Sequence, residues 1–272
     1  MTTSGAASKA CSGEPVPASR MRPTGTLESF GPAVNAAVVG ASGGLGRAFV
    51  DSLAGCPNVD RITTLSRSDP GFVDPKIAWA HIDLEDERTI ARAASEAADI
   101  TEAYHIAIVA TGILHDGAEL QPEKSWRALD GASLEKALRV NTIGPALVAK
   151  HFLPLLARDR KVVFAALSAR VGSIADNDLG GWYAYRASKA ALNMLIKTLS
   201  IELARRNSCA LCVALHPGTV DTALSKPFQR VVPDGKLFSP DVAATNLLGV
   251  LDQATVEDTG RVLAWDGTTI PF

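Results

Sequence analysis

Short runs of apolar residues alternate along the chain with longer segments whose apolar residues recur at helical spacing. Seven runs predict strands, at 34–39, 61–66, 77–82, 106–110, 162–167, 209–215 and 261–264. Helical patterns lie at 45–53, 85–98, 134–156, 183–206 and 240–251. Apolar strands that alternate with helices are typical of a parallel sheet covered on both faces. We therefore expect one doubly wound α/β domain, residues 33–272, built on a parallel sheet of about seven strands.

The first 32 residues do not share this periodicity. Twenty-one of them are Gly, Ala, Ser, Thr or Pro. Such a composition buries too little apolar surface to offset the entropy cost of ordering the chain. We therefore expect a disordered N-terminal tail over residues 1–32. Within the long 134–156 helix, Pro145 is expected to cause a bend.

Composition and charge exclude several classes of protein. The chain has 272 residues, a net charge of −2 and 6% aromatic residues. These values favour neither a nucleic-acid partner nor attachment to an anionic membrane. No apolar stretch reaches the ~20 residues that a transmembrane helix needs. Four cysteines do not form a disulfide framework at this length, which favours a reducing, cytoplasmic location.

Cys209 and Cys212 form a CxxC pattern, for which a metal or redox site is the alternative to core packing. Residues three apart on a strand point to opposite faces of the sheet. A zinc site would need two further ligands at suitable spacing, and none is evident in the sequence. We therefore expect buried thiols and no metal.

A glycine-rich loop follows the first predicted strand and opens a helix, with Gly40, Gly44 and Gly46 at its turns and Ser42 and Leu45 between them. Glycines let the backbone approach a pyrophosphate, and a helix N-terminus presents free N–H groups to it. The alternative is a plain tight turn. The position at the first strand–helix junction favours a dinucleotide site.

Tyr185 and Lys189 lie four residues apart on a predicted helix and therefore share one face. A phenol has a pKa of ~10, and a nearby ammonium is expected to lower it. A tyrosine so placed exchanges a proton with a substrate oxygen near neutral pH. An amphipathic surface helix produces the same spacing, so this pair alone does not decide the function.

The end of the second predicted strand bears on cofactor choice. An acidic residue there binds the ribose 2′-hydroxyl of NAD, whereas an arginine accommodates the 2′-phosphate of NADP. The chain has Ser66 and Arg67, with no carboxylate before Asp69. We therefore expect NADP, with NAD as the alternative; a surface arginine without a ligand is the simpler interpretation of Arg67.

The ordered series resembles the short-chain dehydrogenase/reductase family over residues 33–272. It comprises the three loop glycines, Asp83, Asn141, Ser168, Tyr185-Arg-Ala-Ser-Lys189 and Pro217-Gly218. Segments 109–116 and 180–193 resemble its branch of C-factor and sniffer-type carbonyl reductases. The resemblance implies a Rossmann fold and an oxidoreductase that moves a hydride between a nicotinamide cofactor and a small carbonyl or alcohol substrate. It also implies a homodimer or homotetramer formed through the two long helices.

The resemblance assigns four catalytic roles. Tyr185 is the general acid/base and Lys189 its electrostatic partner, which also holds the nicotinamide ribose. Asn141 anchors a relay water, and Ser168 orients the substrate carbonyl. The implied cofactor-binding residues are Gly40, Ser42, Gly44, Leu45, Gly46, Ser66, Arg67, Asp83, Leu84, Ala110, Gly112, Tyr185, Lys189, Pro217, Gly218, Val220 and Thr222.

The chain departs from the family pattern at the turn of Gly112, which lacks the family's asparagines, and after the fifth strand. Family members carry two adjacent serines after the fifth strand, and the second orients the carbonyl. Here Ser168 aligns with the first and Ala169 with the second, which leaves Ser168, Ser173 or no hydroxyl for this role. Loss of such a donor costs ~10²–10³ in rate. The alternative function is therefore a cofactor-bound signalling or regulatory protein with little turnover. Substrate choice is expected to reside in residues 219–239.

Overall fold

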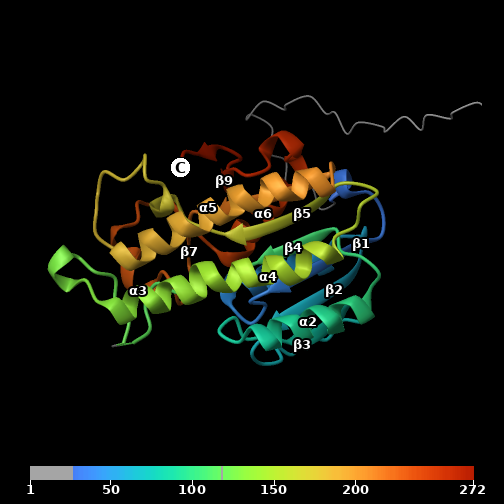
Figure 1. Ribbon diagram of the computed structural model, residues 1–272, viewed down its shortest axis with the longest axis horizontal. Helices are drawn as coiled ribbons and strands as arrows, with labels where there is room; N and C mark the ends of the chain where they lie inside the picture. The colour runs from blue at the N-terminus through green and yellow to red at the C-terminus, as the bar shows by residue number, and fades with distance from the viewer. Residues whose placement is uncertain (1–26, 118) are drawn as a thin grey trace, which may run out of the picture.

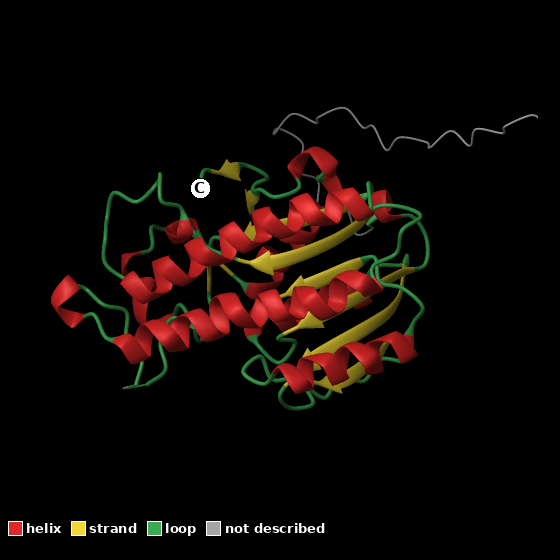
Figure 2. Cartoon of the chain, viewed as in Figure 1, coloured by secondary structure: helices red, strands yellow, loops and turns green. Residues whose placement is uncertain are grey.

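An eight-stranded sheet forms the centre of the computed structural model, which describes residues 27–117 and 119–272. The strands are β1 (Val34–Val39), β2 (Val59–Ser66), β3 (Ile77–His81), β4 (Ile106–Val109), β5 (Val162–Leu167), β6 (Ala210–His216), β9 (Val262–Ala264) and β10 (Thr269–Ile270). Their order is β10-β9-β6-β5-β4-β1-β2-β3, and Figure 2 shows the sheet in yellow between helices. The seven predicted strands are confirmed. The eighth, β10, is an antiparallel strand of two residues.

Helices cover both faces of the sheet (Figure 1). On one face α1 (Gly44–Ala54) packs against α6 (Pro240–Gln253). On the other lie α2 (Glu87–Ile100), α4 (Gly144–Phe152) and α5 (Tyr183–Arg206). Each layer buries its own apolar cluster against the sheet, because successive strand residues point to opposite faces. The predicted doubly wound α/β fold is confirmed.

The sheet order reverses at β1, which pairs in parallel with β2 on one side and β4 on the other. The chain therefore winds in opposite directions from this point. In open α/β sheets such a reversal leaves a crevice at the carboxyl ends of the strands, where ligands bind. The topology alone thus locates the candidate site.

The predicted 134–156 helix is a continuous helical run (Figure 1), but it is not α-helical throughout. It consists of α3 (Gly131–Leu138), a π-helical turn (Arg139–Ile143), α4 and a 3-10 turn (Leu153–Leu155). Pro145 has no N–H to donate to the carbonyl of Asn141, so the α-helical hydrogen-bond ladder is interrupted here. The irregularity therefore precedes the proline, where the sequence placed a bend, and it contains Asn141. π-helical turns occur frequently at functional sites.

The folded chain begins earlier than the expected boundary at Ala33. Leu27 and Phe30 are 2% and 0% exposed and belong to the apolar cluster beneath α1 and α6. The side-chain amide of Asn58 donates to the carbonyl of Leu27 at 2.9 Å and to that of Gly31 at 2.8 Å. Two apolar residues in so short a segment give no periodicity, which is why the sequence placed them in the tail. The rest of the expected tail, residues 1–26, lies outside the described residues.

Cysteine burial agrees with expectation at one of the two CxxC positions. Cys212 is fully buried within β6, whereas Cys209, just before that strand, is half-buried. In the described part of the chain, no helix combines the length and apolar character needed to cross a membrane.

Candidate active site

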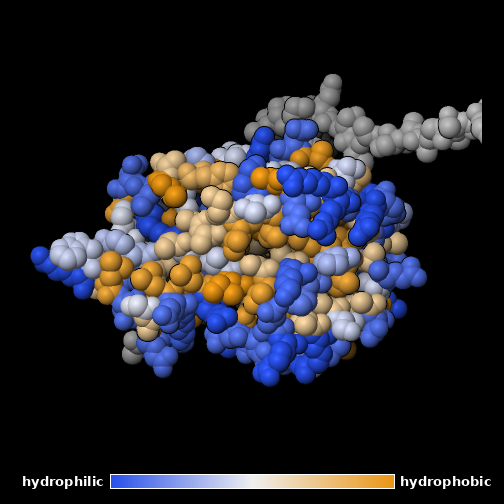
Figure 3. Space-filling view, viewed as in Figure 1, coloured by the Kyte–Doolittle hydropathy of each residue, from blue (hydrophilic) through white to orange (hydrophobic). Residues whose placement is uncertain are grey.

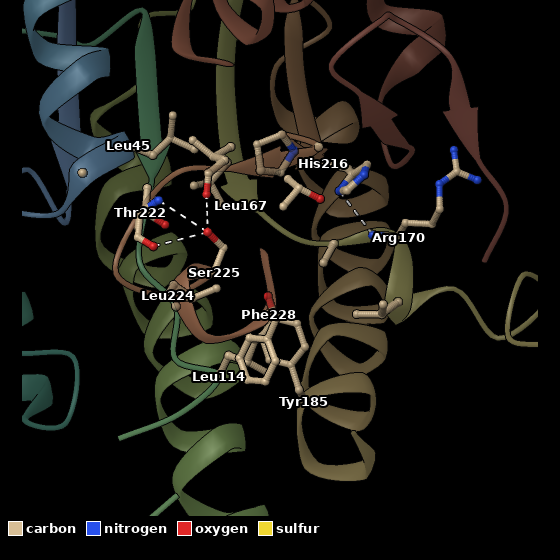
Figure 4. Close-up of a pocket in the computed structure, with 18 of the residues that line it drawn as sticks. Leu45, Leu114, Leu167, Arg170, Tyr185, His216, Thr222, Leu224, Ser225 and Phe228 are labelled. Atoms are coloured by element: carbon tan, nitrogen blue, oxygen red, sulfur yellow. Dashed lines mark hydrogen bonds between the residues drawn. The ribbon is translucent and has the colours of Figure 1, made fainter. Parts of the chain in front are cut away.

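A cavity of about 900 Å³ lies at the carboxyl ends of the central strands. In Figure 4, Leu167 and His216 lie at the ends of β5 and β6 and Leu45 at the start of α1, while Leu114, Leu224 and Phe228 gather at the other end of the cavity. Eleven of the predicted site residues line it. They are Gly44, Leu45, Ala110, Gly112, Ser168, Tyr185, Lys189, Pro217, Gly218, Val220 and Thr222.

The glycine-rich loop brings the start of α1 to the cavity. Gly40 has a φ of +88°, a conformation that favours glycine. A Cβ atom on Gly46 would stand 2.1 Å from the carbonyl oxygen of Gly40, so only glycine permits this approach of helix to turn. No side chain caps the helix at Gly43, and Gly43 and Gly44 line the cavity. The first N–H groups of α1 are thus open to an anionic ligand.

Lys189 and Tyr185 enter the cavity from α5. The Lys189 side chain is 2% exposed, and its Nζ donates to the carbonyl of Leu167 at 2.8 Å. Nζ lies 5.8 Å from the centroid of the Tyr185 ring. Burial lowers the pKa of Lys189 to about 7 and raises the pKa of Tyr185 to about 12.

The expected lowering of the tyrosine pKa is therefore wrong for this structure. Burial disfavours the charged form of both groups, and this effect outweighs the attraction between ammonium and phenolate. At neutral pH Tyr185 holds its proton and is suited to donate it.

Asn141 joins three elements of the site. It is fully buried; its Oδ1 accepts from the N–H of Ile113 at 2.8 Å, and its Nδ2 donates to the Ile113 carbonyl at 2.8 Å. Nδ2 also lies 3.0 Å from the Ser188 hydroxyl. A Cβ on Gly112 would lie 3.5 Å from both Asn141 Oδ1 and Lys189 Nζ. The π-helical turn, the loop after β4 and α5 thus meet beside Lys189.

The Ser168 hydroxyl is engaged inside the protein. Ser168 is 4% exposed, and its Oγ donates to Oδ1 of Asn193 at 2.7 Å. Ala169, the next residue, lines the cavity with a methyl group. Ser173 is not part of the lining, and its Oγ accepts from the N–H of Asp176 at 3.1 Å. In this arrangement neither hydroxyl donates a proton into the cavity.

The other predicted residues outside the lining follow the carboxyl edge of the sheet from β1 toward β3. Arg67 is exposed just after β2 and forms no ion pair within the described chain, although its charge is among those that lower the pKa of Asp116. The Ser66 hydroxyl donates to the Ser68 carbonyl at 2.7 Å, so it is occupied. Asp83 is half-buried after β3. Leu84 packs against Gly144 so closely that a Cβ on this glycine would lie 2.8 Å from the Cβ of Leu84. Ser42 is exposed in the glycine-rich loop.

Sequence reasoning missed an aromatic wall. Trp182 has φ 52° and ψ 44°, and its N–H donates to the Glu123 carbonyl at 2.6 Å. The buried carboxylate of Glu123 accepts from the N–H of Ala184 at 3.2 Å. The ring of Trp182 lies 5.0 Å from that of Phe228, centroid to centroid. Gly180 and Gly181, both with positive φ, were the available signal, but they do not indicate which aromatic residue faces the cavity.

A family model described as short chain dehydrogenase matches residues 34–231. The chain belongs to this family. It is 37% identical over 150 residues to C-signal of Myxococcus xanthus, covering 54% of this chain and 85% of that protein. It is 36% identical over 145 residues to 1-hydroxy-2-glutathionyl-2-methyl-3-butene dehydrogenase of Rhodococcus sp., covering 53% of this chain and 61% of the relative.

Solved structures share the fold of this chain. NADPH-bound carbonyl reductase from chicken fatty liver superposes with a TM-score of 0.78 at 25% identity, covering 93% of this chain and all (100%) of that one. Carbonyl reductase Sniffer of D. melanogaster gives 0.75 at 24% identity, covering 88% and 99%. The predicted family and Rossmann fold are confirmed, and the chain is a NAD(P)-dependent oxidoreductase of the short-chain dehydrogenase type.

Burial of Lys189 should make the free energy of unfolding depend on pH. The pKa of Lys189 is about 7 in the folded chain against 10.5 for an unperturbed lysine, so the cost of burying its charge is complete below pH 7 and declines as pH rises toward 10.5. Lys189→Met should therefore increase the free energy of unfolding more at pH 6 than at pH 9, by about 3 kcal/mol. Urea denaturation at both pH values measures this. Lys197→Met, at an exposed position of the same helix, is the matched control. An equal effect of Lys189→Met at both pH values would contradict the pKa.

Proposed function

We propose that the chain is an NADP-dependent carbonyl reductase in which Tyr185 is the proton donor. The observation that carries this proposal is the meeting of Tyr185 and Lys189 with the start of α1 around one cavity. A proton donor, a cation and an anion-binding helix N-terminus together suit the reduction of a carbonyl by a dinucleotide cofactor.

The residues around the cavity fit a dinucleotide. The open N–H groups of α1 suit a pyrophosphate, and Gly44 and Gly112 leave room where side chains would project. Lys189 would hold the ribose, and Val220 and Thr222 the nicotinamide amide. When bound, the nicotinamide ring supplies the hydride. Asp83 and Leu84 are proposed for the adenine end, beyond the cavity.

Proton transfer is assigned to Tyr185. Its pKa of about 12 keeps the phenol protonated at neutral pH, so it donates to the oxygen of a carbonyl undergoing reduction. Lys189 then stabilises the phenolate that remains, because its buried ammonium lies 5.8 Å from the centroid of the Tyr185 ring. Asn141 anchors the path by which the phenolate regains a proton.

The preference for NADP rests on Arg67. Its exposed guanidinium, unpaired within the described chain, lies at the end of β2, where a ribose 2′-phosphate is bound in related folds. The chicken carbonyl reductase that resembles this chain was solved with NADPH bound. A guanidinium binds phosphate in a bidentate manner, whereas NAD offers it only a hydroxyl.

Replacement of the proposed acid tests the function. Tyr185→Phe should reduce carbonyl turnover at least ~10²-fold, since the proton donor is removed, and should leave cofactor affinity nearly unchanged. Reduction of an aromatic aldehyde is followed at the absorbance of the reduced cofactor. Calorimetric titration with NADPH and NADH gives both affinities, and NADPH should bind more tightly.

Tyr183→Phe, which alters a residue outside the cavity lining on the same helix, is the control. Retained turnover in Tyr185→Phe, or no binding of either cofactor to the unmodified chain, would refute the proposed function.

A cofactor-bound regulatory protein with little turnover is the second candidate. The hydrogen bond from Ser168 to Asn193 and the methyl group of Ala169 favour it, because no serine donates to a carbonyl in the cavity. The similarity to C-signal is consistent with either function.

Restoring the hydroxyl separates these two functions. Ala169→Ser should increase kcat about 10-fold to 10²-fold, because it returns one oriented donor to the cavity. Cofactor affinity should stay constant, as measured by calorimetry. An unchanged kcat would show that carbonyl binding in this site does not need a donor at position 169.

The expected homodimer or homotetramer stays a prediction. Figure 3 shows hydrophobic side chains along the exposed side of the α3–α4 segment. Ile143 in this segment, and Met194 and Ile201 on α5, are 40%, 66% and 48% exposed. These are the helices through which the family resemblance implies association. The cytoplasmic location and the absence of a nucleic-acid, membrane or metal partner likewise stay predictions.

A further inference from the structure

The charged groups that line the cavity are all basic. Arg170, Lys189, His216, Arg230 and Lys236 are among the lining residues, although the guanidinium of Arg170 points away from the cavity (Figure 4), and no carboxylate is present among the described lining residues. A cavity with basic groups of one sign attracts anions. The cofactor is itself an anion. A substrate anion can therefore use only those basic groups that are not already engaged.

Three of the five basic groups are unavailable to a substrate anion, because two are engaged within the protein and one is uncharged. Arg170 pairs with Asp176, Nη1 to Oδ2, at 2.8 Å. Lys189 donates to the Leu167 carbonyl and belongs to the proton-transfer pair. Burial and the nearby Arg170 lower the pKa of His216 to about 4, so its imidazole is neutral at physiological pH. These groups provide no free positive charge for a substrate.

Arg230 and Lys236 remain. Neither forms an ion pair with a carboxylate in the described chain, although Lys226 on the same segment pairs with Asp221 at 3.5 Å. The Nζ of Lys236 lies over the Trp265 ring, 6.0 Å from its centroid, and both Arg230 and Lys236 are exposed. Arg230 lies on the 3-10 helix η6 (Lys226–Val231), and Lys236 directly precedes β8 (Leu237–Phe238). Both cations therefore belong to the segment that covers the cavity after β7 (Thr219–Val220).

The same segment supplies the apolar wall. Phe228 of η6 packs on Trp182, whose ring lies 6.3 Å from that of Tyr185, centroid to centroid. His115 Nε2 lies 3.1 Å from the Ala223 carbonyl, which joins the loop after β4 to this segment. A molecule whose carbonyl reaches Tyr185 would therefore lie against aromatic side chains, with Arg230 and Lys236 on the covering segment.

We propose that the substrate is an aldehyde or ketone with an apolar, aromatic-sized body and a carboxylate, and that Arg230 and Lys236 bind the carboxylate. The inference rests on the proposed function, because the carbonyl is placed by Tyr185. A guanidinium and an ammonium together suit a carboxylate, and apolar side chains bind the body between the two ends. Arg230 and Lys236 are thus specificity-determining residues.

The test compares an acid with its neutral ester. 4-Carboxybenzaldehyde and methyl 4-formylbenzoate are reduced with NADPH, and kcat/KM is measured for each. The unmodified chain should prefer the acid about tenfold, mainly through KM, and added salt should reduce this preference. Arg230→Met with Lys236→Met should remove the preference, and Arg230→Lys should retain part of it. Lys226→Met is the matched control, because Lys226 is on the same segment but outside the lining.

A binding experiment distinguishes failure of this inference from failure of the proposed function. Calorimetry with the NADP⁺-loaded chain should show 4-(hydroxymethyl)benzoate binding about tenfold more tightly than its methyl ester, and the double substitution should equalise them. Equal kcat/KM for acid and ester would overturn the inference while leaving the reductase function intact. Weaker NADPH binding by the double variant would also overturn it, since the cations would then serve the cofactor. Absence of cofactor binding and of turnover would refute the proposed function itself.

Discussion

The burial of Lys189 is the constraint on which the candidate site depends. The Nζ of Lys189 donates to the carbonyl of Leu167 at the end of β5. A Cβ on Gly172 would stand only 2.8 Å from the Cβ of Lys189. These contacts hold α5 against the end of the sheet and place Tyr185, one turn earlier, at the cavity. Burying an ammonium costs free energy, and such costs are concentrated at functional sites.

The remaining features combine around this anchor. Reversal of strand order at β1 opens a crevice, and the glycine-rich loop directs the start of α1 toward it. The crevice therefore has an anion-binding end and a proton-donating side. The segment after β7 closes the opposite end with Phe228 and carries Arg230 and Lys236. In the proposed function, the start of α1 binds the cofactor phosphates and Tyr185 binds the carbonyl oxygen. Arg230 and Lys236 bind the substrate carboxylate.

Sequence patterns predicted what depends on local chemistry. Continuous apolar runs located seven strands, and ordered motifs located Tyr185, Lys189 and the glycine-rich loop. Pro145 indicated an irregularity in the helix, but not that it takes the form of a π-helical turn around Asn141. The packing of Leu27 and the contact of Trp182 with Phe228 could not be predicted, because they depend on distant segments. The predicted direction of the pKa shift of Tyr185 was wrong for the same reason. Spacing on a helix indicates a neighbouring ammonium, but the desolvation of both groups depends on the whole fold.

The proposed function is hydride transfer to a carbonyl in this cavity. The most direct measurement follows a label: NADPH carrying deuterium at the transferable C4 position is mixed in stoichiometric amount with the chain and an aromatic aldehyde. Mass spectrometry of the product alcohol reports the result. We expect one deuterium on the carbinol carbon for each cofactor oxidised. Cofactor binding without deuterated alcohol would contradict it and would favour the regulatory function.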